Sequence, residues 1–437
     1  MTTTASDYPT PPFQAPALPV GEFAAFIGLD WGERKHAIAL RPRSIGRAAV
    51  ESLELEHSAE NLHAWIKEIG KRFGHQPVAI ALESSKGAVV AALMEYPWLV
   101  LYPIHPSTSR RFSTAFTPSG AKDDMPDAQI LLEIIESHRQ RLRALVPQDA
   151  ATRRVAMLVE VRRKLVDSRT HATNQITSLL KNYYPQALEL TGESLCAPMA
   201  MDFLGRWPEL AVLQRAKAQT VRDFYRAHNV RSPERIEARL ALIKGTCPLT
   251  EDRALCEVSV LHLAALIAEV RALSAHVAKA DAAIATAFAS HPDAQIFQSL
   301  PGAGPALAPR LCVLFGANRE RWSNASELQK YYGIAPVTER SGRQQYVHWR
   351  WSAPVFARQS LVEWAGQSIK WCEWAKAYYL QQKERKNRHS SILRSLAFKW
   401  LRILWRCWRD GKTYDDTLYV AHLRERKAPL LDFLHAA

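Results

Sequence analysis

Cysteine is scarce in this chain, and none of the six cysteines stands in a CxxC pair or near a histidine pair with the spacing of zinc ligands. That absence argues against a structural zinc site and a disulfide framework, and it fits a reducing cytoplasm. No apolar run is expected to span a bilayer, and residues 1–21 have neither the basic start nor the apolar core of a secretory signal. The sequence therefore predicts a cytoplasmic protein that has no membrane partner.

Acidic side chains are outnumbered by basic ones, and this imbalance indicates the class of partner. The 437 residues include 57 Lys and Arg but 43 Asp and Glu, which leaves a formal net charge of +14 at pH 7. Hydrophobic residues make up 47% of the chain, so a wholly disordered protein is excluded. The length predicts two or three domains. A polyanion is the natural partner of such a chain, although many basic proteins bind no nucleic acid.

Composition and periodicity divide the chain into four predicted segments. Residues 1–21 are rich in proline and almost uncharged, which predicts a disordered tail. Residues 22–148 predict an α/β domain, in which three neighbouring antiparallel strands precede helices that alternate with two further strands. Residues 149–290 predict a helical linker, and its Leu- and Ala-rich part from 254 to 289 has the spacing of a bundle or coiled-coil seam. Residues 291–437 predict a helical, all-α C-terminal domain.

The C-terminal segment combines aromatic and basic residues, and two interpretations of it stay open. Nine of the thirteen tryptophans follow residue 320, with Arg and Lys interleaved, which suits stacking on bases and contacts with phosphates. The other interpretation is a packed core, and we favour it for one helix face made of Trp400, Leu401, Leu404, Trp405 and Trp408. A Pro-Gly-x-Gly turn at residues 301–304 either exposes N–H groups to a phosphate or packs between two helices.

Four acidic residues stand where an α/β sheet opens its functional edge. Asp30 ends the first predicted strand and Glu83 ends a later one, and such strand ends line the ligand crevice of α/β sheets. Asp124 and Asp127 are three residues apart, so on a helix they share a face. A helix cap explains one aspartate but not the set. Converging carboxylates bind hard divalent cations, Mg²⁺ above all with Mn²⁺ as the alternative, and two such ions orient a phosphodiester.

A serine lies in a predicted basic loop of the C-terminal segment. Ser341 is flanked by Arg340 and Arg343, and Gly342 gives the backbone room. A serine hydroxyl is a poor nucleophile unless a group removes its proton or stabilises the developing charge, and arginines beside a metal-bound phosphate meet the second need. A serine–glycine pair in a loop is more often only a turn, so the pattern alone leaves both interpretations open.

The order of these features resembles one protein family. The three-strand start with its acidic residues is similar to the RNase H-like nuclease fold, and most similar to its RuvC-like branch. Over residues 23–182 and 291–415 the chain resembles the transposases of the insertion-sequence-110 family, also called DEDD transposases. The features that carry this resemblance are Asp30, Glu83, the segment Lys122-x-Asp124-x-x-Asp127-Ala128, a basic long helix, the Pro-Gly-x-Gly turn and the Tyr-x-Gly-Ile-Ala-Pro segment before Ser341.

The resemblance implies a mechanism and a set of partners. A RuvC-like domain would hold the metal through residues that correspond to Asp30, Glu83, Asp124 and Asp127, and a C-terminal transposase domain would supply Ser341. That serine would attack the DNA phosphodiester and form a covalent 5′-phosphoserine intermediate. The partners implied are double-stranded donor and target DNA, a structured bridge RNA that pairs with both, and further copies of the chain in dimers and tetramers. The compartment implied is the bacterial cytoplasm, in association with the nucleoid.

The chain departs from the family pattern directly after its serine. Residues 343–361 carry tryptophans where the family commonly has a glycine-rich basic stretch and an Ile-x-Lys-x-Gly segment. Two alternatives therefore remain: a metal-only RuvC-like nuclease or resolvase, in which water attacks, and a catalytically inactive derivative that binds nucleic acid. The predicted nucleic-acid contacts are the basic residues of the helix after residue 149 and those beside the serine, namely Arg153, Arg154, Arg162, Arg163, Lys164, Arg340 and Arg343.

Overall fold

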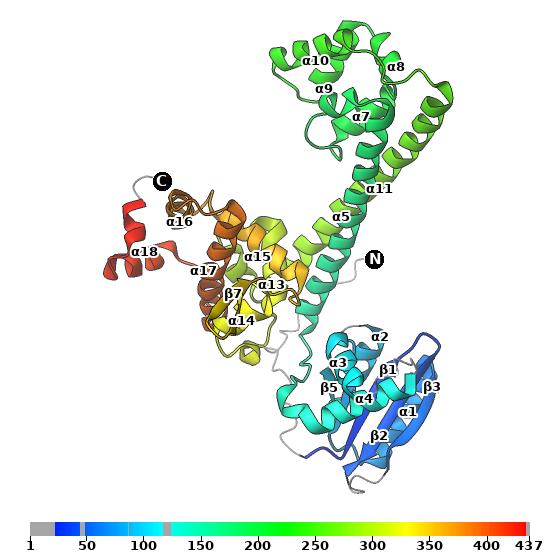
Figure 1. The fold of residues 1–437 in the computed structure, drawn as a ribbon, viewed down its shortest axis with the longest axis vertical. Helices are drawn as coiled ribbons and strands as arrows, with labels where there is room; N and C mark the ends of the chain where they lie inside the picture. The colour runs from blue at the N-terminus through cyan, green and yellow to red at the C-terminus, as the bar shows by residue number, and fades with distance from the viewer. Residues whose placement is uncertain (1–21, 44–48, 86, 117–123, 434–437) are drawn as a thin grey trace, which may run out of the picture. The chain divides into compact units, whose positions relative to one another are not determined.

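The computed structural model describes residues 22–43, 49–85, 87–116 and 124–433. The chain forms two compact units, Met1–Asp149 and Ala150–Ala437 (Figure 1). The predicted tail at residues 1–21 and the motif residue Lys122 lie outside the described residues. The mixed character predicted for the chain, an α/β part followed by a mainly helical part, is confirmed.

The first unit is built on a five-stranded mixed sheet with the order β3-β2-β1-β4-β5. β1 pairs antiparallel with β2, and β2 pairs antiparallel with β3, whereas β4 runs parallel to both β1 and β5. All five residues of β4 are buried, as its continuous apolar run predicts. The three antiparallel strands expected at the start of the domain are therefore confirmed. The strands are β1 (Ala25–Trp31), β2 (Lys35–Pro42), β3 (Glu51–Glu56), β4 (Val78–Leu82) and β5 (Leu99–Pro103).

Helices cover both faces of this sheet because its strands alternate apolar side chains to either side. Ile27 and Ile80 point to the face covered by α1 and α2, where they share an apolar cluster. Ala79 and Ala81 point to the opposite face and pack against α4. α3 is an additional helix that was not predicted from the sequence. The helices of the first unit are α1 (Ala59–Arg72), α2 (Ala88–Leu93), α3 (Pro106–Phe116), α4 (Asp124–His138) and the 3₁₀ turn η2 (Arg139–Arg141).

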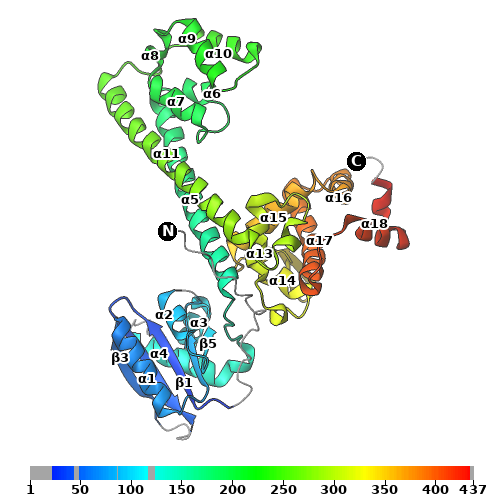
Figure 2. The same cartoon turned by 180° about the vertical axis from the view of Figure 1, so that it is seen from behind.

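Two long helices form the scaffold of the second unit. α5 (Ala150–Tyr183) and α11 (Arg253–Ala289) lie side by side and run in opposite directions (Figure 2). One end of this pair belongs to an apolar core with the C-terminal helices, and the other end belongs to a separate core with α6–α10. The helices of that second core are α6 (Gln186–Leu190), α7 (Pro198–Arg206), α8 (Leu210–Gln214), α9 (Ala218–Ala227) and α10 (Pro233–Gly245).

The apolar length of α11 corrects one expectation. Among the described helices, α11 is long and apolar enough to cross a membrane by length and composition, so the prediction that no run reaches that length is wrong. Its neighbour α5 gives it a protein partner, and an ion pair between Arg162 and Asp281 joins the two helices. Val258 and Leu261 remain exposed on α11.

The C-terminal helices pack around a tryptophan-rich core. Trp400, Leu401, Leu404 and Trp408 are fully buried, which confirms the predicted core face, and Trp405 is half-buried against the same cluster. The helices are α12 (Ala294–Gln298), α13 (Gly304–Phe315), the 3₁₀ turn η3 (Arg319–Arg321), α14 (Ala325–Tyr331), α15 (Val355–Ser368), α16 (Glu373–Glu384), α17 (His389–Asp410), α18 (Asp416–Glu425) and the 3₁₀ turn η4 (Pro429–Phe433).

One feature of the C-terminal segment contradicts a prediction from the sequence, and a second decides between two interpretations that the sequence left open. The C-terminal segment is not all-α, because β6 (Val337–Ser341) and β7 (Gln344–His348) form an antiparallel hairpin. The Pro-Gly-x-Gly turn packs between helices. A Cβ at Gly302 would lie 2.8 Å from the carbonyl carbon of Gln367 in α15, so this turn faces protein.

Candidate active site

The first pair of predicted site residues lies on adjacent strands at one edge of the sheet. The parallel register pairs Leu29 of β1 with Leu82 of β4, so the next residues, Asp30 and Glu83, lie level with each other. Adjacent strands place such Cα atoms about 4.8 Å apart. Asp30 is the second-last residue of β1 and Glu83 follows the last residue of β4, so each is shifted by one residue from the strand end that was predicted.

Gly28 brings the second pair of carboxylates to the same edge. A Cβ at Gly28 would lie 1.9 Å from the carbonyl oxygen of Ala128, so only glycine lets the backbone of α4 rest directly on β1. Asp30 points to the same face as Gly28, since side chains alternate along a strand. Asp124 and Asp127 form the first turn of α4, immediately before this contact. The packing of α4 therefore carries both aspartates toward Asp30.

The other three carboxylates act electrostatically on Asp30. Burial, and after it the charges of Asp127, Asp124 and Glu83, raise the pKa of Asp30 from 3.8 to about 6, against the opposing effect of a backbone hydrogen bond at Trp31. Within the described parts of the chain, no salt bridge joins a Lys or Arg to Asp30. Asp30 therefore lies among carboxylates whose negative charges raise its pKa.

The donor set fits a hard divalent cation in its chemistry, although its oxygens do not meet at one point. Among the described residues, no group of three or more Asp, Glu, His or Cys side chains has the arrangement of a metal site. Charges act on one another over several ångströms, whereas Mg²⁺ coordinates oxygen at about 2 Å. The structure thus brings the four charges together, and rotation of the side chains is needed to bring their oxygens to one ion.

A buried serine that the sequence analysis missed orients one of these carboxylates. The hydroxyl of Ser109, in α3, donates a hydrogen bond to Oε1 of Glu83. Ser109 is only 7% exposed, and Glu83 is an exposed residue just beyond β4. No local pattern marks a serine as a partner of a residue 26 positions earlier, so only the packing of α3 beside the sheet edge reveals it.

The predicted nucleophile lies at the tip of the β6–β7 hairpin rather than in a loop. Ser341 pairs with Gln344, which leaves Gly342 and Arg343 as a two-residue turn. Gly342 has φ +57°, a backbone conformation that glycine adopts readily at the first position of such a turn. Ser341, Arg340 and Arg343 are all exposed. Within the described residues no side chain accepts a hydrogen bond from Ser341, so any activation has to come from a ligand or another element.

Two of the predicted basic contacts on α5 form ion pairs within the chain. Arg162 pairs with Asp281 of α11, and Arg163 pairs with Glu160 and Asp167 of its own helix. Ion pairs within the chain reduce the charge that such arginines offer to a ligand. The other three residues of this set, all exposed, are Arg153, Arg154 and Lys164.

Comparisons with known proteins agree with this arrangement of features. A family model for DEDD transposases of the IS110 type, described as a transposase, matches residues 27–185. A second model, described as the transposase IS116/IS110/IS902 family, matches residues 294–380. The first match includes all four carboxylates, and the second includes the hairpin that carries Ser341.

Relatives align with almost the whole chain. A Streptomyces coelicolor protein named as a mini-circle transposase for IS117 is 28% identical over 411 residues, which cover 92% of this chain and 98% of the relative. The 43.6 kDa protein of insertion element IS110, from the same species, is 25% identical over 414 residues, or 91% of this chain and 97% of the relative. The 42 kDa protein of insertion element IS900 from Mycobacterium paratuberculosis is 25% identical over 78% of this chain and 85% of its own length. The chain therefore belongs to the IS110 family of transposases, which are DNA-processing enzymes.

Proposed function

We propose that this chain cuts and exchanges DNA strands of an insertion sequence through a covalent phosphoserine intermediate at Ser341, with Mg²⁺ or Mn²⁺ bound by Asp30, Glu83, Asp124 and Asp127. One observation carries this proposal. The pKa of Asp30 is raised to about 6 by burial and by all three of the other carboxylates. Carboxylates that raise one another's pKa in this way form a favourable site for a divalent cation.

An RNase H-like, RuvC-like fold of the first unit is part of the proposal. The sheet order β3-β2-β1-β4-β5, with its antiparallel start and parallel continuation, supports it. So does the position of Asp30 and Glu83 on neighbouring strands beneath the start of α4. The division of the remainder into a helical linker at 149–290 and a transposase domain at 291–437 remains a prediction.

The proposed reaction has two steps, attack by the serine on the DNA phosphate and the reverse reaction with a new 3′-hydroxyl. The bound divalent ion supplies orientation and charge stabilisation for the scissile phosphate. Oγ of Ser341 attacks the phosphorus and loses its proton to water, and an Oγ–P bond forms. The bond from phosphorus to the 3′ oxygen breaks, and that oxygen takes up a proton from water and leaves as a 3′-hydroxyl. Arg340 and Arg343, exposed beside Ser341, contact the phosphate oxygens on which charge develops. The reverse reaction with a different 3′-hydroxyl completes strand exchange.

The proposal includes the partners of the chain. Double-stranded donor and target DNA and a structured bridge RNA are the nucleic acids, bound in the cytoplasm in association with the nucleoid. Dimers and tetramers of the chain are the assembly. Exposed Val258 and Leu261 on α11 support this last point, since exposed apolar side chains on a long helix favour helix pairing. Arg153, Arg154 and Lys164 on α5 are proposed as phosphate contacts.

The decisive experiment is capture of the covalent intermediate. Full-length protein is incubated with Mg²⁺, labelled donor and target DNA and the RNA transcribed from the non-coding flank of its element, and adducts are resolved on a denaturing gel. We expect a protein–DNA adduct in the wild type and in Ser178→Ala, an exposed serine of α5, but none in Ser341→Ala. An adduct that persists in Ser341→Ala rules out the serine assignment. Cleavage without any adduct identifies a metal-only nuclease, and nucleic-acid binding without cleavage identifies an inactive derivative.

A further inference from the structure

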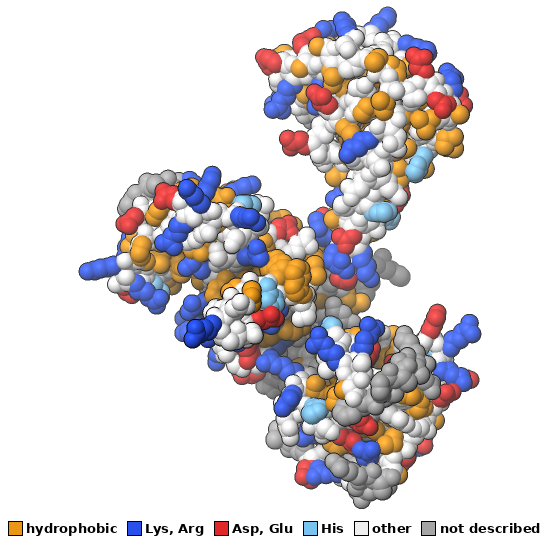
Figure 3. Space-filling view, in the orientation of Figure 1, with side chains coloured by type: hydrophobic (Ala, Val, Ile, Leu, Met, Phe, Trp, Pro, Cys, Tyr) orange, Lys and Arg blue, Asp and Glu red, His pale blue; other side chains and the backbone are white. Residues whose placement is uncertain are grey.

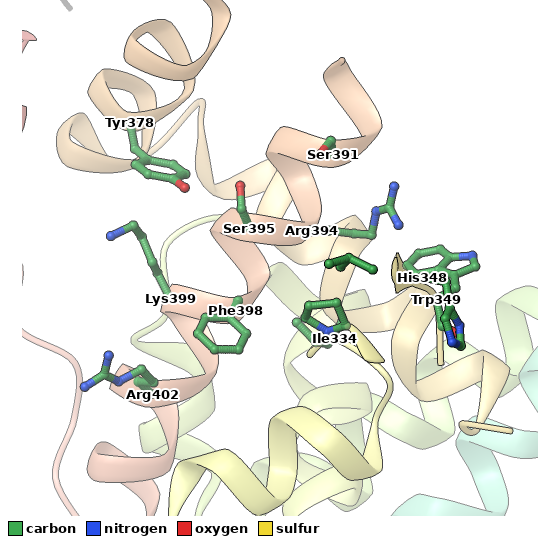
Figure 4. A pocket seen from close by; sticks show the side chains of 12 residues that line it. Ile334, His348, Trp349, Tyr378, Ser391, Arg394, Ser395, Phe398, Lys399 and Arg402 are labelled. Carbon is green, nitrogen blue, oxygen red and sulfur yellow. The ribbon is translucent and has the colours of Figure 1, made fainter. Parts of the chain in front are cut away.

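A groove runs along the face of α17 that lies opposite its tryptophan core. The groove has a volume of about 620 Å³, within the range of about 300–1,000 Å³ that is typical of ligand sites. Its walls are Trp349, which follows β7, and Tyr378 of α16, on opposite sides of α17 (Figure 4). Its floor follows the three- and four-residue spacing of one helix face: Ser391, Arg394, Ser395, Phe398, Lys399 and Arg402.

The groove continues toward the C-terminal end of α17. A second cavity, of about 1150 Å³, shares Phe398, Lys399 and Arg402 with the first and extends to Asp410. From Ser391 to Asp410 an α-helix rises roughly 30 Å. The two cavities therefore form one long channel, and many Lys and Arg side chains cover the C-terminal helices on the face seen in Figure 3.

Two cations of the first cavity lie against aromatic rings, whereas Arg406 of the second cavity pairs with Asp410. The guanidinium of Arg394 lies 3.7 Å from the ring centre of Trp349, and Nζ of Lys399 lies 4.9 Å from that of Tyr378. No Asp or Glu lines the first cavity, and no salt bridge between described residues involves Arg394, Lys399 or Arg402. A ring face orients a cation without cancelling its full charge. These positive charges therefore remain available to an anion.

Crowding and burial make the charged forms of these side chains less stable, so a bound anion would stabilise them. Burial lowers the pKa of Lys399, and the neighbouring charge of Arg402 lowers it further. Burial also lowers the pKa of Arg394, and the charge of Arg358 lowers it further. The guanidinium of Arg358 lies 4.8 Å from the ring centre of Trp349. Like charges placed together in a partly buried groove are stabilised by a bound anion, because the ligand compensates both the repulsion and the lost hydration.

We propose that this channel binds one strand of nucleic acid through its phosphates and leads it to Ser341. A row of recessed cations between ring walls suits a single flexible backbone, whereas the phosphates of a duplex lie on a wide convex surface. His348 lines the groove at the base of the β6–β7 hairpin, where it pairs with Val337. Ser341 is four residues farther along β6, about 13 Å away. This role for the channel rests on the proposed function of Ser341.

The test compares three charge removals inside the channel with three outside it. Full-length protein binds fluorescent single-stranded DNA, single-stranded RNA and duplex DNA of one mixed sequence, each about 16 nucleotides or base pairs long. Arg394→Gln, Lys399→Gln and Arg402→Gln together are expected to weaken single-strand binding at least about tenfold and to reduce its logarithmic salt slope by about 2. The matched control removes three exposed charges elsewhere on the C-terminal helices: Lys370→Gln, Lys383→Gln and Arg385→Gln.

The outcomes separate the channel from the serine mechanism. A loss of affinity for the single-stranded DNA or the RNA that is greater than in the control supports the channel. The probe that loses affinity identifies which nucleic acid the channel binds. Equal losses in the two triple variants, or a loss confined to the duplex, overturn it. Arg402→Glu changes one exposed side chain outside the core, and it is expected to weaken binding of the same single-stranded probe about fivefold. This variant tests the channel if the triple variant does not fold. Ser341→Ala is expected to bind these probes like the wild type. A wild-type protein that binds the single strand through the channel but forms no covalent adduct refutes the serine mechanism and leaves the channel in place.

Discussion

The edge of the N-terminal sheet and the channel on α17 are opposite in charge, but both crowd like charges together. At the sheet edge, burial and three neighbouring carboxylates raise the pKa of Asp30 to about 6. In the channel, burial and the charge of Arg402 lower the pKa of Lys399. Each region therefore keeps like charges close together. The comparison teaches that such crowding favours a ligand of the opposite charge, and we propose a divalent cation at one region and a polyanion at the other.

The two regions reach this state by different structural means. The carboxylates are placed by backbone geometry, since the β1–β4 register aligns Asp30 with Glu83 and the contact at Gly28 fixes the start of α4. The cations are placed by side-chain packing, since the rings of Trp349, just after β7, and Tyr378 of α16 contact arginine and lysine of α17. We therefore expect the acidic site to be sensitive to backbone changes and the channel to be sensitive to loss of its rings.

Removal of one carboxylate tests the acidic region most strongly. Asp30→Asn is expected to reduce Mg²⁺-dependent DNA cleavage at least about 100-fold, because a neutral amide weakens binding of the cation that orients the phosphate. Glu68→Gln, an exposed residue of α1, should cleave like the wild type. Initial rates over a Mg²⁺ titration measure the effect, and an unchanged rate in Asp30→Asn removes the metal-site proposal.

Gly28→Ala tests whether backbone contact builds the acidic site. The added Cβ would lie 1.9 Å from the carbonyl oxygen of Ala128, so α4 has to move. We expect about 2–3 kcal/mol of destabilisation, and weaker cleavage because Asp124 and Asp127 move with α4. Gly245→Ala, where nothing lies within 4 Å of the added Cβ, is the control and is expected to be neutral or slightly stabilising. Denaturant unfolding measures both; equal stabilities contradict the close contact.

Asp30→Asn should also stabilise the fold, the opposite sign to its effect on cleavage. The folded-state pKa of Asp30 is raised from 3.8 to about 6, so the folded chain binds this proton more tightly than the unfolded chain does. Stability of the wild type therefore falls as the pH rises from about 4 to about 6, and this fall is absent from the variant. At pH 7 without metal we expect a gain of about 1–3 kcal/mol, reduced by solvent screening. Thermal melts should show that Mg²⁺ narrows this difference, and a variant less stable than wild type contradicts the charge crowding.

Ser109→Ala tests the hydrogen bond that orients Glu83. Its loss leaves the metal-binding carboxylate free to rotate, and we expect cleavage at low Mg²⁺ to fall about tenfold, with recovery at high Mg²⁺. Ser107→Ala, which removes an exposed serine of the same helix, is the control. A rate loss that excess Mg²⁺ does not restore assigns Ser109 a purely structural role.

The smallest expected effect tests the ring wall of the channel. Trp349→Leu keeps an apolar side chain but removes the ring that lies beside Arg394 and Arg358. Cation–π contacts of this kind contribute about 0.5–1 kcal/mol each, so single-stranded DNA binding is expected to weaken about threefold. Trp371→Leu, an exposed tryptophan outside the channel, is the control. Equal affinity in the two variants shows that the rings do not position the cations.

Sequence patterns predicted those parts of the molecule that depend on local periodicity. The alternating strands at 35–42 and 49–57, the buried strand β4 and the core face around Trp400 all follow from apolar spacing. The β6–β7 hairpin was missed because both faces of its strands are exposed and polar, which leaves no apolar alternation to detect. Ser109 was missed because its partner, Glu83, comes from a different element.

The sequence by itself determined that this protein carries four carboxylates at strand ends and a helix start, a serine among arginines, and a basic aromatic C-terminal segment. Only the tertiary structure decided which of these groups share an environment. Register and the contact at Gly28 join Asp30 electrostatically to three residues up to 97 positions away. The channel needs Trp349, Tyr378 and α17 in one place. The reason is physical: periodicity is set by neighbours along the chain, whereas charge crowding is set by distances through space.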